Sequence, residues 1–188
     1  MNPQIARNTQ RGTSRMTVII LASIGAIIVL GLLGIYLFAP RIDVARKRLN
    51  ESTAMAAIRK LSTSQVNYFS SFENVGYAPD LASLGPGPDG KCGASATPSH
   101  ACIIDAVLGA SACTGTNWCT QAGYNFMIQG VCSNGKCTDY VISATPVDAL
   151  SGSRNFCSTN DAALRSETAA PKSAPFSLEE CHALPATQ

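Results

Sequence analysis

An uncharged run near the N-terminus, Thr17 to Ala39, is the feature that most constrains how this chain can fold. Its 23 residues would form an α-helix about 34 Å long, which is enough to cross a bilayer once. The apolar core of a cleavable signal peptide is usually shorter, about 7 to 15 residues. A cut after Ala39 would also place Pro40 directly downstream. We therefore expect an uncleaved transmembrane helix at residues 16–39, after a short basic cytoplasmic leader at residues 1–15.

The charges are distributed unevenly along the chain. Residues 1–60 hold nine Lys and Arg against two Asp and Glu, whereas residues 61–188 hold five against ten. Binding to nucleic-acid phosphates requires clustered Lys and Arg, so the acidic distal part argues against a nucleic-acid partner. The membrane is the partner that the apolar run predicts.

Basic residues lie on both sides of the apolar run: Arg7, Arg11 and Arg15 before it, and Arg41, Arg46, Lys47 and Arg48 after it. Counted by the positive-inside rule, they slightly favour a cytoplasmic location for the distal part of the chain. The cysteines indicate the opposite orientation.

All eight cysteines lie in the distal part: Cys92, Cys102, Cys113, Cys119, Cys132, Cys137, Cys157 and Cys181. An even number of cysteines within 90 residues is typical of a disulfide framework formed in an oxidising compartment. Zinc sites usually take their ligands as C-x₂₋₄-C pairs, and only Cys132 and Cys137 have such a spacing. We expect disulfides, no metal site, and an extracytoplasmic body with the N-terminus in the cytoplasm.

Residues 40–72 predict an amphipathic stalk. Apolar or large side chains recur at steps of three and four: Ala54, Ile58, Leu61, Gln65, Tyr68 and Phe72. Polar residues fall on the other positions: Arg59, Lys60, Ser62 and Asn67. This period is that of one face of an α-helix. We expect a single helix from residue 17 to about residue 72, with its stripe packed on the body.

The body, residues 73–188, predicts loops and short strands. Glycine and proline in Leu84–Gly93 exclude regular structure. The apolar residues of Cys102–Leu108 have the spacing of a short buried helix. Ser153–Ser158 is a candidate strand, and residues 168–188, which hold three prolines, predict an irregular tail tied down through Cys181.

The clearest local signal is a β-hairpin within Tyr124–Pro146. Two β-rich runs flank Asn134 and Gly135, the pair that best suits a type I′ turn. That turn makes Ser133 and Lys136 the first hydrogen-bonded pair of the hairpin.

The same register places Cys132 opposite Cys137 at a non-hydrogen-bonded position, where Cα atoms lie close together. We predict a disulfide between them, which would stabilise by about 2 kcal/mol in the chain-entropy model. The pairing of the other six cysteines stays open.

Several stretches carry a resemblance to a known family. They are Pro40 followed at ten and eleven residues by Asn50 and Glu51, then Ile58, Arg59, Leu61, Gln65 and Tyr68, and further on IDAVL from Ile104, GYNF from Gly123 and YVISATPV from Tyr140. Over about residues 17–165 the chain resembles type IV pilins and the pseudopilins of type II secretion. The resemblance implies an α+β fold, in which a long N-terminal membrane-spanning helix packs on a small disulfide-rich antiparallel sheet.

The N-terminus departs from the family pattern. Pilins carry Gly before the peptidase cut and Glu at the fifth mature position, where this chain has Arg15 and Ile20. No Glu precedes Glu51. An intramembrane carboxylate is costly unless it is paired, and in the family that Glu is thought to pair with the N-terminal amine of a neighbour.

Two functions remain open. The resemblance implies a non-enzymatic subunit, a minor component of a type IV pilus or type II secretion pseudopilus, located in the inner (cytoplasmic) membrane. Its partners would be other pilin-like subunits, and Gly25, Gly31 and Gly34 would allow close packing of their helices, although glycine is also common in membrane helices generally. The missing Glu favours the alternative, a monomeric membrane-tethered extracytoplasmic binding module that does not polymerise.

Candidate catalytic residues are few. The body holds two histidines, His100 and His182, as possible bases. It also holds the adjacent carboxylates Glu179 and Glu180, but neighbouring positions in a tail direct their side chains apart, so they do not suit paired acid–base chemistry. The sequence contains no G-x-S-x-G, P-loop or H-E-x-x-H motif. We expect no catalytic residue and no cofactor.

Overall fold

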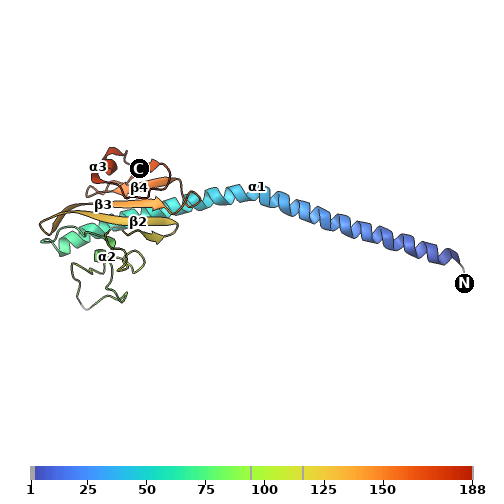
Figure 1. Ribbon diagram of the computed structural model, residues 1–188, viewed down its shortest axis with the longest axis horizontal. Helices are drawn as coiled ribbons and strands as arrows, with labels where there is room; N and C mark the ends of the chain where they lie inside the picture. The colour runs from blue at the N-terminus through green and yellow to red at the C-terminus, as the bar shows by residue number, and fades with distance from the viewer. Residues whose placement is uncertain (1–2, 94, 116, 188) are drawn as a thin grey trace. The chain divides into compact units, whose positions relative to one another are not determined.

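A computed structural model describes residues 3–93, 95–115 and 117–187 of the chain, with side chains at 16–34 and at the described residues from 42 onward. Together they form an α+β protein (Figure 1). Its elements are α1 (Pro3–Ser71), α2 (Leu81–Leu84), β1 (Cys119–Gln121), β2 (Tyr124–Ser133), β3 (Lys136–Pro146), β4 (Arg154–Ser158), β5 (Arg165–Thr168) and α3 (Leu178–Ala183).

Helix α1 is continuous through both the apolar run and the stalk, as the sequence predicts. It begins earlier than the expected residue 17, at Pro3, a residue whose fixed φ suits the first helical turn. The chain divides into two compact units, residues 1–45 and 46–188. The arginine side chains of the leader, and residues 1 and 2, lie outside the described part. The predicted boundaries at residues 15, 39 and 72 stay predictions.

Within the first unit, the segment Met16–Gly34 is long and apolar enough to cross a membrane. Its large apolar side chains are exposed. A signal sequence near an N-terminus would show the same two properties, so the helix is either a membrane span or a signal segment.

The second unit is built on a five-stranded antiparallel sheet in the order β1-β2-β3-β4-β5. Strands β2 and β3 are the longest and form the predicted hairpin (Figure 1). Ser133 pairs with Lys136, and Cys132 with Cys137. Asn134 and Gly135 have φ angles of 52° and 79°, as a type I′ turn requires. The hairpin prediction is confirmed, as is the strand expected at Ser153–Ser158, which is β4.

The C-terminal part of α1 runs along the sheet and buries the predicted stripe (Figure 1). Ala54, Ile58, Leu61 and Tyr68 join one core with large side chains from the strands: Tyr124, Phe126, Ile128, Tyr140, Ile142 and Phe156. Phe72 is partly buried against this core.

One stalk residue does not lie where the sequence places it. Ser62 is buried, although its position is not part of the apolar stripe. Its hydroxyl lies 3.3 Å from that of Ser158, which is also buried. A serine can occupy this site because its hydroxyl has a partner.

The prediction of a short helix at Cys102–Leu108 is wrong. This segment forms turns, and Val107 is exposed while Ile104 and Leu108 are buried. The Asp105 carboxylate accepts hydrogen bonds from the amides of Val107 and Leu108 and so competes with helical bonding. Cys102 has a φ of 55°, which an α-helix does not permit.

The tail is more regular than expected. The helix α3 lies within the residues 168–188 expected to be irregular, and Thr168 at the start of this tail still pairs with Arg154 as the last residue of β5. A capping box begins α3, because the Ser177 hydroxyl accepts from the amide of Glu180 while the Glu180 carboxylate accepts from the amide of Ser177. The Ser-x-x-Glu pattern was visible in the sequence, so this helix could have been predicted.

Candidate functional site

The polar residues of the stalk that belong to the family-like stretch bind the body. Asn50 and Glu51 lie on α1 where it reaches the loop between β3 and β4. The Asn50 side chain donates to the carbonyl of Ser151 at 2.9 Å. Glu51 accepts from the amide and the hydroxyl of Ser153, at 2.9 and 2.7 Å, and pairs with Arg154 at 2.9 Å. These contacts fix the loop against the helix.

Glu51 is only 6% exposed, so its charge must be compensated within the protein. Burial raises the pKa of its carboxyl, but the hydrogen bonds from Ser153 and Arg154 and the charge of Arg154 outweigh burial, and the pKa lies below its ordinary value. The carboxylate is therefore the form that the folded protein prefers. The acidic residue of the family-like stretch holds helix and sheet together in this chain.

Two further residues of that stretch anchor the segment after the helix. The Gln65 amide pairs with the backbone of Ala78, donating to its carbonyl at 3.0 Å and accepting from its amide at 2.8 Å. Both residues are fully buried. The Tyr68 hydroxyl donates to the carbonyl of Pro98 at 2.7 Å. Burial raises the pKa of Tyr68.

The hairpin is tied to the segment that follows α1. The amide of Tyr77 donates to the carbonyl of Cys137, and the amide of Cys137 donates to the carbonyl of Val75. Between them, Gly76 has a φ of 84°, and a Cβ there would overlap the Cys137 carbonyl oxygen. Glycine is required at this position for both reasons.

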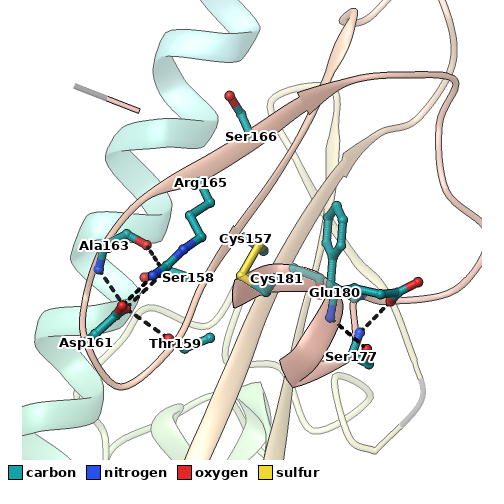
Figure 2. The surroundings of a disulfide bond; sticks show 12 residues. Cys157, Ser158, Thr159, Asp161, Ala163, Arg165, Ser166, Ser177, Glu180 and Cys181 are labelled. Carbon is teal, nitrogen blue, oxygen red and sulfur yellow. Dashed lines mark hydrogen bonds and ion pairs between the residues drawn. A yellow bond between two sulfur atoms is a disulfide. The ribbon is translucent and has the colours of Figure 1, made fainter. Parts of the chain in front are cut away.

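The eight cysteines form four disulfides, and each joins a cysteine to the next cysteine along the chain: Cys92–Cys102, Cys113–Cys119, Cys132–Cys137 and Cys157–Cys181. The pair expected from the hairpin register is thus bonded, and the structure supplies the other three pairings. Cys157 and Cys181 are fully buried and attach α3 to β4 (Figure 2).

A polar cluster that the sequence did not predict lies beside this last disulfide (Figure 2). Arg165 forms an ion pair with Asp161, which also accepts from the hydroxyl of Thr159 and the amide of Ala163 (Figure 2). The hydrogen bonds from Arg165, then those from Ala163 and Thr159, together with the charge of Arg165, lower the pKa of Asp161 despite burial. The cluster closes the turn between β4 and β5. The i, i+4 spacing of Asp161 and Arg165 was its only sequence signal.

The residues considered for catalysis lie apart. His100 is in a loop, and its buried Nδ1 has no hydrogen-bond partner among the described residues. His182 is exposed on α3, where Glu180 serves the capping box and lies 3.8 Å from Lys172. Within the described ranges, no group of three or more His, Cys, Asp or Glu is arranged to hold a metal ion.

The three glycines considered for helix packing lie in the apolar segment of α1. A Cβ built at Gly25, Gly31 or Gly34 would meet no atom within 4 Å. The space beside each glycine is therefore open in a single chain.

Comparisons with protein-family models, with curated proteins and with solved structures found no match. The architecture, an apolar N-terminal helix continued by a helix packed on a disulfide-bonded antiparallel sheet, is pilin-like.

Proposed function

We propose that this protein is a non-enzymatic pilin-like subunit, a minor component of a type IV pilus or of a type II secretion pseudopilus. It is held in the inner (cytoplasmic) membrane by one helix, with its N-terminus in the cytoplasm and its body outside. Four disulfides support an oxidising location for the body.

The observation that carries the proposal is the continuity of α1. One helix includes the exposed apolar segment Met16–Gly34 and the stripe buried in the core of the body. A body joined to an apolar helix in this way can be added to a bundle of similar helices. The open space at Gly25, Gly31 and Gly34 suits close approach of a neighbouring helix.

A membrane-tethered monomer is the second candidate. No Glu lies in or before the apolar segment, so the helix lacks the charge that the family is thought to use in assembly. The tethered module would keep the same architecture and use loops of the body for binding, since binding residues concentrate on loops.

A shearing experiment separates the two candidates. Cells are sheared, and the released and membrane fractions are compared for this chain. A filament subunit leaves with the sheared material, whereas a tethered monomer stays with the membranes. Replacement of Gly31 by Leu should reduce release of a subunit because it fills the space at the helix, and replacement of Leu30 by Ile is the control. If neither the variants nor the wild-type chain is released by shearing, filament membership is overturned.

The intact mass of the unreduced protein from membranes tests processing and orientation together. Loss of the first dozen or so residues would show processing as a pilin. A full-length chain with all cysteines oxidised would favour the tethered module, and free thiols throughout would contradict an extracytoplasmic body.

The absence of a catalytic role is tested with His100 and His182. A hydrolytic activity that is lost when either histidine is replaced by Gln would contradict the proposal.

A further inference from the structure

We propose that one end of the body, where α1 enters it, docks on the surface of an anionic bilayer. The docking face consists of four residues of α1 and two residues of the β3–β4 loop: Arg46, Lys47, Arg48 and Leu49, with Val147 and Leu150. The proposal rests on the membrane anchoring proposed above. It does not depend on filament membership.

The basic part of the docking face is available for anions. Arg46 and Arg48 are exposed, and Lys47 is half-buried. Among the described residues, none of the three forms an ion pair within 4 Å. The nearest acidic group from the loop is Asp148, whose pKa is lowered by hydrogen bonds from Ser151 and also by the charge of Lys47. Two arginines therefore remain free to meet lipid phosphates.

The apolar part comes from two segments. Leu49 is 66% exposed on α1, and Leu150 and Val147 are 67% and 47% exposed at the β3–β4 loop. Large side chains this exposed on a folded body suit insertion into the boundary between headgroups and acyl chains.

The two segments are held side by side. The Asn50 side chain binds the carbonyl of Ser151, and Glu51 binds the amide of Ser153. β3 ends beside α1 at this end of the body (Figure 1). The Asp148 carboxylate also accepts from the amides of Leu150 and Ser151, which shapes the loop tip. The face is thus formed before it meets a membrane.

Its place in the chain identifies a lipid surface as the partner. Arg46 follows the uncharged run by seven residues, which is about 10 Å of helix and comparable with the Debye length of about 8 Å. Basic residues on the extracytoplasmic side run against the positive-inside rule. Binding of anionic headgroups gives these residues a role there, and exposed leucines beside them give the face the composition of an interfacial surface.

The test uses the full chain in nanodiscs whose lipids carry bromine on the acyl chains, which quenches tryptophan nearby. The native tryptophan is removed by Trp118→Phe, and one reporter is added by Leu150→Trp, by Val66→Trp or by Leu30→Trp. Val66 is the matched control, 52% exposed on α1 within the body, and Leu30 reports on the anchor. Complete oxidation of the cysteines in each variant shows that the body has folded.

We expect strong quenching at Leu30, clear quenching at Leu150 when phosphatidylglycerol is present, and little at Val66. Adding Arg46→Gln and Arg48→Gln should lower the ratio of docked to undocked bodies about fivefold for each arginine. Quenching at Leu30 without quenching at Leu150 would overturn the docking face and leave the anchor intact. No quenching at Leu30 would overturn the anchoring and the docking together. A change at Leu150 that follows the number of chains per nanodisc, and not the lipid charge, would overturn the proposal in favour of contact between copies.

Discussion

Glu51 is the residue on which the junction of helix and body depends most. Its side chain is buried and accepts three hydrogen bonds, from the backbone and hydroxyl of Ser153 and from Arg154. Removing one member of a buried ion pair destabilises the folded protein, because the remaining charge is left buried without a partner. The charge and its partners come from positions about 100 residues apart in the sequence, so this contact closes the fold between its first helix and its fourth strand.

Replacement of Glu51 by Ala should lower the free energy of unfolding by about 3 kcal/mol, because Arg154 and the Ser153 amide lose their acceptor. Urea unfolding of the full chain in detergent micelles measures the loss. The control is Glu73→Ala at an exposed position, which should change stability by less than about 0.5 kcal/mol. Equal losses in the two variants would contradict the role of Glu51.

Stability should also depend on the protonation of Glu51. The folded-state pKa lies below the ordinary value of 4.5, so this stabilisation is fully present above pH 4.5 and is lost as the pH falls through the folded-state pKa. Glu51→Gln cannot titrate, so the gap in unfolding free energy between wild type and this variant should narrow from about pH 6 to about pH 3. A gap that widens on acidification would contradict the assignment.

At the scale of elements, the hairpin β2–β3 and the segment after α1 depend on each other. Backbone hydrogen bonds join Val75 and Tyr77 to Cys137, and the amide of Gly130 donates to the carbonyl of Pro79. The segment after α1 is therefore held on one side by Gln65 of the helix and on the other side by the hairpin. Elements that are short or irregular alone are fixed here by backbone pairing.

Gly76→Ala should lower the free energy of unfolding by at least about 2 kcal/mol, since the new methyl group overlaps the Cys137 carbonyl. Gly90→Ala is a matched control, because Gly90 also has a positive φ, 69°, but open space around it. The control should lose only about 1 kcal/mol from backbone strain. Thermal unfolding of both variants separates the cost of the steric overlap from the cost of backbone strain. Equal decreases in the melting temperature of the two variants would contradict a steric overlap at Gly76.

The disulfides should differ in their contribution to stability. Cys157–Cys181 closes a sequence separation of 24 and Cys132–Cys137 one of 5. In the chain-entropy model their removal should cost about 3.5 and about 2 kcal/mol, respectively. Paired Cys→Ala variants of each bridge, compared by urea unfolding, measure the difference. A larger loss from the hairpin bridge would show that the loop-length account does not hold here.

At the scale of the whole molecule, the two units are stabilised by different means. The apolar segment of α1 has exposed side chains in a single chain and needs an apolar environment, whereas the body has its own core and four disulfides. The body is small, and covalent links compensate for a limited core.

Reduction of the full chain in micelles should therefore unfold the body and leave the apolar helix intact. Hydrogen exchange measured by peptide should show lost protection over β2–β4 and retained protection over Met16–Gly34. The untreated chain is the control. Protection of β2–β4 that survives full reduction would show that the core alone is sufficient.

Much of the architecture could be predicted because it rests on local patterns. The long helix followed from an uncharged run and a stripe of period 3.6, and the hairpin followed from Asn134 and Gly135. Errors arose where local bonding competed with periodicity. The Asp105 carboxylate binds the backbone amide of Val107, so the apolar segment around it forms turns and not a helix. Ser62 is buried in the core because the hydroxyl of Ser158 is its hydrogen-bond partner.

The sequence by itself determined the apolar helix, the amphipathic stalk, the hairpin register next to its turn and the pair Cys132–Cys137, because each depends on residues close together in the chain. Only the tertiary structure decided the other disulfides, the ion pair of Glu51 with Arg154, and the placing of Leu150 beside α1. The ion pair, the Cys157–Cys181 bridge and the placing of Leu150 join segments distant in sequence, so their partners are selected by the packing of the body. Cys92–Cys102 and Cys113–Cys119 are close in sequence, but they lie in loops, where no regular register predicts which cysteines meet.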